Sequence, residues 1–213
     1  SYFNVGSAIL RQVIGIPMGS DPAPFFANLF LYYYESKWLQ SLKSRDHQLA
    51  RKFGNVFRYI DDLLAINDGG EFERVYLDIY PPELELKKEN NGNDAATFLD
   101  IELNINNKTI STKLYDKRVN YRFKIVRFTY KSSTLPSKMF FSTISAELLR
   151  ISRATSSFPS FITAAKALIF RMKNQGADML GIMKTIRKML YRHQDEFTKY
   201  LTDIGDIIFR LQE

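Results

Sequence analysis

The spacing of apolar residues changes along the chain, and this change predicts two kinds of architecture. Short apolar runs predict β-strands, and these runs lie at 56–66, 84–88, 97–105 and 109–115. Beyond Pro136, apolar residues recur at i, i+3 and i+4, which predicts helices over 137–155, 160–175, 178–192 and 195–211. The expected fold class is therefore α+β, with an antiparallel sheet and packed helices followed by a mainly helical domain.

Turn-forming residues separate these elements. Residues 67–70 (Asn-Asp-Gly-Gly) predict a turn after the first run, and Asn106-Asn107 predict the turn of a hairpin formed by the last two runs. Gly176 is expected to end the helix over 160–175, and Gly205 weakens the last predicted helix. The change of pattern places a domain boundary near 132–136, giving domains 1–133 and 134–213.

Two more helices are expected in the first domain. A helix runs from Asp21 towards Leu42, with Ser20 or Asp21 as its cap, and a shorter one covers 71–80 before Pro81-Pro82. The first helix carries an apolar stripe that is interpreted as core packing: Phe26, Leu29, Phe30, Tyr33 and Tyr34. Residues 43–52 are interpreted as a polar connection, and no strand signal precedes Ile9.

Composition narrows the range of functions. Among 213 residues, 45% are hydrophobic and 14% aromatic, which is typical of a globular protein. Thirty Lys and Arg against 23 Asp and Glu give a net charge of +7, which suits a nucleic-acid partner or serves solubility alone. The absence of cysteine excludes disulfides, thiol nucleophiles and cysteine-based zinc sites. No apolar run approaches the roughly 18 residues of a membrane span.

Two adjacent acids interrupt the apolar run at 56–66. Asp61 and Asp62 follow Tyr59-Ile60 at the expected tip of the hairpin. Neighbouring carboxylates repel each other unless solvent, a cation or a metal offsets their charge. They are either exposed turn residues or a binding site for Mg²⁺, and the apolar residues on both sides favour the binding site.

A basic, aromatic segment spans residues 113–131. Its aromatic residues are interleaved with seven cations, which are Lys113, Lys117, Arg118, Arg122, Lys124, Arg127 and Lys131, and Asp116 is its only acid. This mixture suits neutralisation of phosphates together with stacking on bases or sugars, and a solvated charged loop is the alternative.

These motifs together resemble a reverse transcriptase, most closely that of Penelope-like retroelements. The loop Gly15-Ile16-Pro17-Met18-Gly19 with Ser20 and a following helix is similar to the B motif of that family. Tyr59-Ile60-Asp61-Asp62, which begins 40 residues after Gly19, is similar to the C motif. Lys87 and Lys88 fall where a D motif would lie. Phe98, Leu99 and Asp100 fall where the E motif, or primer grip, would lie.

The resemblance implies a polymerase palm over about residues 9–105 and a thumb over the helical remainder. Asp61 would be the principal ligand of a two-metal Mg²⁺ site, and Asp62 a second ligand or an electrostatic support. Tyr59 and the loop of Gly15, Ile16, Pro17, Met18 and Gly19 would lie beside the primer end, the template base and the incoming nucleotide. Lys87 or Lys88 would donate a proton to the leaving pyrophosphate. The alternative is that each lysine is simply exposed to solvent. The implied partners are an RNA template, a DNA primer and deoxynucleotides.

The chain departs from the family pattern in one respect. Another metal-binding aspartate belongs to an upstream A motif, and no acid precedes Gly15 here. We therefore expect a fragment, the C-terminal half of a polymerase core, that is inactive by itself. The missing strand would leave a sheet edge and the apolar face of the helix at 25–34 uncovered, so we expect a homodimer or a covering chain.

Two alternatives remain open. The chain could be a reverse-transcriptase-derived scaffold that binds nucleic acid or protein without catalysis, or a basic helical protein whose hairpin acids are incidental. An intracellular and nuclear location is implied by the resemblance alone.

Overall fold

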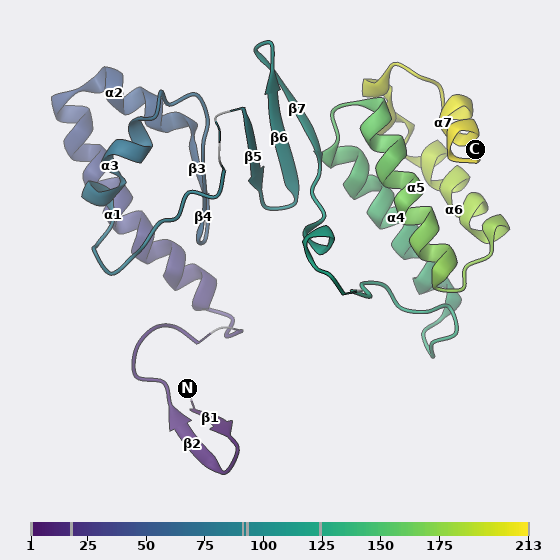
Figure 1. Cartoon of the computed structure of the whole chain (residues 1–213), viewed down its shortest axis with the longest axis horizontal. Helices are drawn as coiled ribbons and strands as arrows, with labels where there is room; N and C mark the ends of the chain where they lie inside the picture. Colours follow the sequence, from purple (N-terminus) through teal and green to yellow (C-terminus); the bar gives the residue numbers. More distant parts are fainter. Residues whose placement is uncertain (1, 18, 91, 93, 124, 213) are drawn as a thin grey trace. The chain divides into compact units, whose positions relative to one another are not determined.

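The computed structural model describes residues 2–17, 19–90, 92, 94–123 and 125–212. The chain forms two compact units, Ser1–Lys88 and Glu89–Glu213 (Figure 1). Packing therefore groups residues 89–133 with the helices, which differs from the division at 133/134 expected from the change of sequence pattern. In the described part of the chain, no helix combines the length and the apolar character needed to cross a bilayer.

The first unit alternates hairpins and helices. Strands β1 (Tyr2–Val5) and β2 (Ala8–Arg11) pair antiparallel before the glycine loop, and helix α1 covers Ala23–Arg45. Helix α2 (His47–Lys52) and a 3₁₀ turn (Phe53–Asn55) lead into the second hairpin. This hairpin consists of β3 (Val56–Tyr59) and β4 (Asp62–Ala65), and helix α3 (Glu71–Ile79) follows it.

Only one side of α1 is covered in the first unit. Towards its C-terminal end, Leu42 is buried and the Trp38 ring meets Phe53 edge-on at 4.8 Å between centroids. The residues of the expected core stripe behave differently: Phe26, Leu29, Phe30 and Tyr33 are each about half exposed, and only Tyr34 is more covered. The interpretation of this stripe as core packing is therefore wrong for four of its five residues, because no described element of this unit covers that side.

The second unit begins with a three-stranded antiparallel meander. Its strands are β5 (Ala95–Phe98), β6 (Ile101–Asn106) and β7 (Thr109–Leu114), in the order β5-β6-β7. A short 3₁₀ turn (Lys117–Asn120), labelled η2 here, opens the irregular connection to the helices. The hairpin expected over 97–115 is present as β6 and β7, but the first run is broken in two by a tight turn at Leu99-Asp100.

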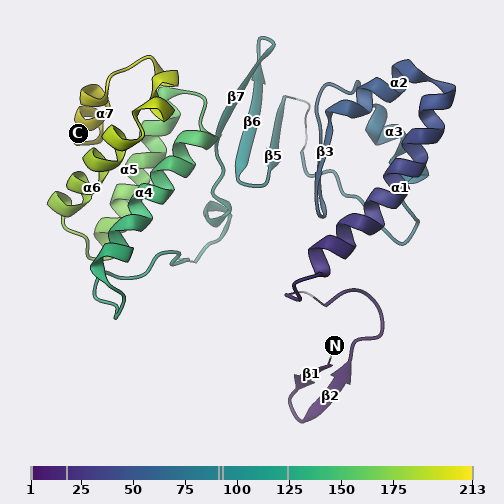
Figure 2. The same cartoon turned by 180° about the vertical axis from the view of Figure 1, so that it is seen from behind.

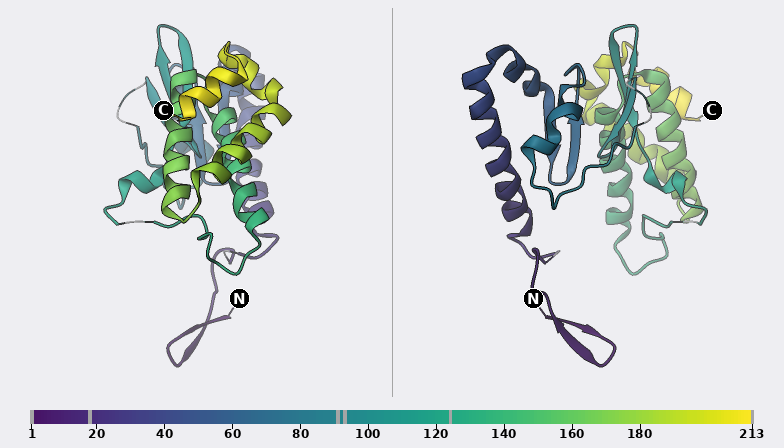
Figure 3. Two further views of the ribbon diagram at one scale, coloured as in Figure 1. Left: turned by 90° about the vertical axis from the view of Figure 1, so that its right-hand side faces the viewer. Right: turned by 60° about the vertical axis from the view of Figure 1, so that its left-hand side comes forward.

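Helices complete the second unit and hold the main core. They are α4 (Ser137–Ala154), α5 (Phe158–Asn174), α6 (Met179–Arg192), the 3₁₀ helix η3 (Gln194–Tyr200) and α7 (Ile204–Gln212). Figures 2 and 3 show the helices packed together beside the sheet, where α4 and α5 both contact β7. Fully buried side chains from every helix meet in one cluster, including Ile144, Phe161, Ile186, Phe197 and Ile207.

A buried polar group fastens the end of α4 to η3. The hydroxyls of Thr155 and Tyr200 lie 2.7 Å apart, and the Tyr200 hydroxyl also donates to the Ser152 carbonyl at 3.2 Å. The Lys199 ammonium donates to the carbonyls of Ser152 and Thr155. These donors bond to carbonyls at the C-terminal end of α4, where the positive charge of Lys199 suits the helix dipole.

Several predicted elements differ from those observed. Residues 84–88 form no strand, because no neighbouring strand supplies a ladder and the Leu84 N–H instead bonds to the Pro81 carbonyl. Part of the expected polar connection at 43–52 is helical, since the Asp46 carboxylate caps α2. The single helix expected over 195–211 is two, divided at Leu201, which has a left-handed backbone.

Candidate functional site

The tip of the β3–β4 hairpin carries the acid pair. The hairpin that the sequence predicts is present, but its turn consists of Ile60 and Asp61, because Tyr59 already pairs with Asp62. Ile60 has a φ of 54°, a left-handed conformation that is strained for a β-branched residue. The hairpin therefore presents Asp61 at its apex and Asp62 at the first position of the returning strand.

Side chains of α1 support this hairpin through Arg58 of β3. The Arg58 guanidinium makes a two-pronged ion pair with the Glu35 carboxylate, at 2.6 and 3.1 Å, and also donates to the Asn28 Oδ1 at 2.7 Å. It donates as well to the carbonyl of Ile60, at 3.3 Å, inside the strained turn. Arg58 thus connects helix α1 directly to the backbone that carries the two aspartates.

Tyr80, which follows the last residue of α3, also bonds to Glu35 and so adds to this support. Its hydroxyl donates to the Glu35 Oε1 at 2.8 Å, and its ring is buried. Burial, followed by the hydrogen bond to Glu35, raises the pKa of Tyr80 well above its usual value. The phenol therefore stays protonated at neutral pH and remains a donor to the carboxylate.

The two aspartates themselves are exposed to solvent. Within the described residues, neither carboxylate makes a hydrogen bond or an ion pair. Exposed carboxylates with free oxygens are the ligands that Mg²⁺ prefers, so this tip fits a hard divalent cation. The described residues contain no group of three acids or histidines close enough to hold a metal, so two protein carboxylates are what this tip offers.

The glycine loop has the backbone that its two glycines predict. Gly15 and Gly19 have φ values of 84° and 86°, which other residues adopt at a cost. Ile16 and Pro17 lie between them in the described part, whereas Met18 lies outside the described residues. The Ser20 hydroxyl donates to the Pro17 carbonyl, and α1 starts after Pro22 with no side-chain cap. The prediction that Ser20 or Asp21 caps this helix is therefore wrong.

The two candidate lysines lie in the same unit as the acid pair. Lys88 pairs with Glu73 of α3 at 2.8 Å, and Lys87 is exposed in an irregular segment. Among the described residues, no hydrogen bond, ion pair or ring contact joins Lys87, Lys88 or the glycine loop to Asp61 or Asp62.

The residues of the expected primer grip form the β5–β6 turn of the second unit. Phe98 ends β5, Leu99 has a φ of 55°, and Asp100 pairs with Arg150 of α4 at 2.7 Å. The Asp100 carbonyl also accepts the N–H of Tyr115 at 2.8 Å. The turn is thus fastened to both the sheet and the first long helix.

Most of the basic segment is engaged within the protein. Lys113 pairs with Glu102, Arg118 with Asp116, Arg127 with Glu147, and Lys131 with Asp178. Lys117 and Arg122 are exposed and make no side-chain contact within the described residues, and Lys124 lies outside those residues. Four of the seven proposed phosphate ligands therefore have a structural partner already.

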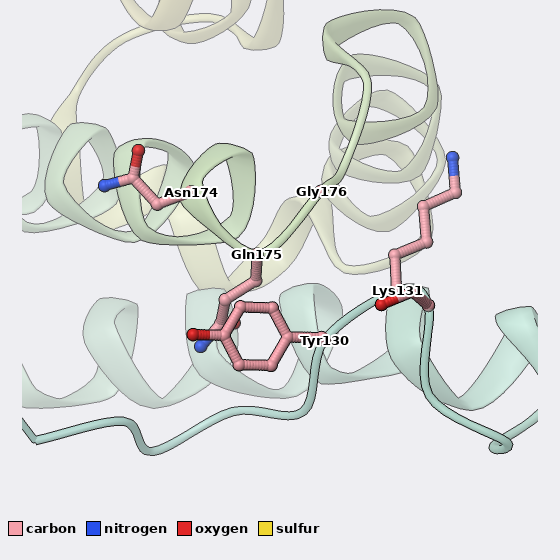
Figure 4. Close-up of a pocket in the computed structure, with 6 residues that line it drawn as sticks. Tyr130, Lys131, Asn174, Gln175 and Gly176 are labelled. Atoms are coloured by element: carbon pink, nitrogen blue, oxygen red, sulfur yellow. The ribbon is translucent and has the colours of Figure 1, made fainter.

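The end of this segment lines a surface hollow of about 440 Å³ (Figure 4). The Lys131 N–H donates to the Gln175 carbonyl at 2.9 Å, and the Gln175 Nε2 donates to the Phe128 carbonyl at 2.8 Å. Gly176, at φ 91°, ends α5 as its sequence position predicts. These bonds fix the segment to the helical core.

No family model, curated protein or solved structure matches this chain. The resemblance to reverse transcriptases therefore remains a hypothesis based on the motifs themselves.

Sequence reasoning missed the residues that support the hairpin. Glu35 is a lone acid at the end of an aromatic run, and Arg58 a lone cation inside a strand. Isolated charges of opposite sign in two apolar elements are a signal for pairing, because a buried charge needs a partner.

Proposed function

We propose that this chain is part of an RNA-directed DNA polymerase of a mobile element and supplies half of its metal-binding site. The proposal rests on one observation: Asp61 and Asp62 are exposed, without a partner among the described residues, on a strained hairpin that Arg58 supports. A two-residue hairpin turn needs a positive φ at its first residue, which is usually glycine, asparagine or aspartate rather than isoleucine. It does not need an arginine bonded to its backbone. Both features are typical of a site whose geometry is held for a ligand.

In this proposal Asp61 and Asp62 hold Mg²⁺, which when bound would neutralise charge on the attacking and leaving oxygens of a phosphoryl transfer. Arg58 positions the turn that carries both acids, and Tyr59 lies beside them as a flat, half-exposed ring. The glycine loop allows a base or nucleotide to approach its backbone closely. The substrates would be a template RNA, a DNA primer and deoxynucleotides, and the place of action the nucleus.

Metal binding by the chain itself is the first test of this proposal. We expect calorimetric titration with Mn²⁺ to give weak binding, and Asp61→Asn to abolish it. The matched control is Asp78→Asn, which removes an exposed acid from α3 and should change nothing. Equal binding by the wild type and Asp61→Asn would contradict the proposal.

Activity is the second test, and it requires the full-length protein. Asp61→Asn should lower primer extension by at least about a hundredfold, because a catalytic metal supplies several kcal/mol to the transition state. The present chain alone should incorporate no nucleotide, and incorporation by it would overturn the view that a further carboxylate is needed.

A non-catalytic scaffold is the second candidate, and the exposed apolar side of α1 favours it. Phe25, Phe26, Leu29, Phe30 and Tyr33 are each about half exposed or more, which is typical of a protein contact surface. We propose that this side mediates formation of a homodimer or is covered by another chain. Unchanged primer extension by the full-length Asp61→Asn variant would favour the scaffold.

A further inference from the structure

Helix α6 has a strongly basic outer side. Ile182, Ile186 and Leu190 on its inner side are fully buried in the core. Its outer side exposes four cations and one aromatic ring, which are Lys184, Arg187, Lys188, Tyr191 and Arg192. The helix contains no acid. The cations at i, i+3, i+4 and i+8 therefore share one exposed side.

These cations differ from several others in the same unit. Lys113, Arg118, Arg127, Lys131, Arg150 and Arg153 each pair with an acid. Within the described residues, none of the four cations on α6 makes a hydrogen bond or an ion pair. Like charges one turn apart, such as Lys184 and Lys188, destabilise a helix. Packing gives no reason for this arrangement.

The shape of this side fits a phosphate backbone. From Lys184 to Arg192 the helix rises about 12 Å at 1.5 Å per residue, which spans three to four phosphates of one strand at about 3.4 Å each. Tyr191 is 63% exposed among these cations and offers a ring for stacking on a base.

A lipid surface fits this helix less well. A helix that lies in a membrane interface buries its apolar side among lipid chains. The apolar side of α6 is occupied by the protein core, and its exposed apolar residues, Met179 and Leu180, lie at the end away from Arg192.

We propose that the outer side of α6 is a nucleic-acid-binding surface that contacts the phosphate backbone through Lys184, Arg187, Lys188 and Arg192. It is separate in sequence from the basic segment at 113–131, and it needs neither Mg²⁺ nor the aspartates. This inference depends on the proposed function in one respect only, which is that the ligand is a nucleic acid.

The test is binding of a fluorescein-labelled 20-nucleotide single strand, and of its duplex, by the whole chain in EDTA over a series of NaCl concentrations. The variant is Lys184→Gln with Arg187→Gln, Lys188→Gln and Arg192→Gln. The control neutralises four exposed cations elsewhere in the unit that likewise have no ion pair among the described residues: Lys108→Gln, Lys138→Gln, Lys166→Gln and Lys173→Gln. Both sets lower the net charge by the same amount.

We expect the slope of log affinity against log salt to fall by about 3 in the α6 variant, because each lost phosphate contact contributes roughly 0.7 to 0.9. The control should lose less than about 1. Lys184→Arg with Lys188→Arg keeps the charge and should bind like the wild type. Circular dichroism melts of all variants check that the helix is retained.

An unchanged slope in the α6 variant, or equal losses in the variant and the control, would overturn this inference. Preferential binding of the wild type to vesicles of anionic lipid would overturn it as well. The Asp61→Asn variant should bind the strand normally, so failure here is distinguishable from failure of the metal site.

Discussion

At the scale of single residues, two turns in this chain share an unusual backbone conformation, an aliphatic residue with a positive φ. Ile60 and Leu99 have φ values of 54° and 55°, and each is followed by an aspartate. Each follows a strand whose last residue is aromatic, Tyr59 or Phe98. Aliphatic residues resist the left-handed region, so the surrounding contacts must hold them there. At Ile60 the hydrogen bond from Arg58 provides such a contact.

The strain at Ile60 leads to a first prediction. Ile60→Gly should raise the free energy of unfolding by up to about 1 kcal/mol, because glycine adopts a positive φ without a steric penalty. The same change should weaken Mn²⁺ binding, since the turn loses its fixed position. Urea titration followed by circular dichroism measures the first effect. A loss of stability would show that the turn is not strained.

A second prediction concerns Asp116, which connects η2 to α5. Its carboxylate bonds to Arg118 and Arg171, at 2.7 and 2.5 Å, and the hydrogen bond from Arg118 is the main reason that its pKa is lowered to about 2. A lowered pKa stabilises the fold above the unfolded value near 3.8, and this stabilisation disappears as the pH falls towards 2.

Asp116→Asn should therefore cost about 1 to 2 kcal/mol at pH 7. The difference between wild type and variant should shrink as the pH falls from about 4 towards 2. Unfolding by urea at several pH values measures it. A difference that stays constant over that range would assign the effect to packing rather than charge.

At the scale of elements, α1 has two distinct parts. Its N-terminal part exposes aromatic residues, whereas Glu35 and Trp38 fasten its later turns to the hairpin, to α3 and to Phe53. The ion pair between Arg58 and Glu35 is mostly shielded from solvent, with side chains 14% and 29% exposed. A pair in that position cannot lose one partner without leaving an uncompensated charge.

Removing one partner should accordingly destabilise the first unit. Arg58→Met is expected to cost about 2 kcal/mol, and combining it with Glu35→Gln should cost less than the sum of the single changes. Lys52→Met breaks the more exposed Lys52–Glu71 pair and should cost below about 1 kcal/mol. Urea titration of the wild type, the two single variants of the pair, their double variant and Lys52→Met provides the comparison. Strictly additive losses would mean that the pair contributes no coupling.

At the scale of the whole molecule, the two units differ in how much core they hold. The main cluster of buried residues lies entirely between Phe128 and Leu211, in the second unit. The first unit buries few large side chains, among them Leu42, Ile79 and Tyr80, and exposes an aromatic helix. We therefore expect the first unit to be less stable by itself than the second unit and to associate with other chains more readily.

We expect the chain to self-associate at tens of micromolar. Light scattering should give a mass above that of a monomer, and Phe26→Lys with Phe30→Lys should restore the monomer. Lys substitutions at Tyr121 and Phe123, exposed aromatic residues in the second unit, serve as the control. A clean monomer of the wild type would contradict association through α1.

Periodicity in the sequence by itself determined the α+β class, the three helices between 137 and 192, and the hairpin that carries Asp61 and Asp62. These features depend on local spacing and turn chemistry, which a single segment contains. Tertiary structure decided the rest. It left 84–88 without a partner strand, divided the last helix at Leu201, and placed four of the seven expected phosphate ligands in ion pairs. It also paired Glu35 with Arg58 and left the cations of α6 without an acid partner in the part of the chain that the structure describes. Which charges meet depends on contacts between segments far apart in the chain.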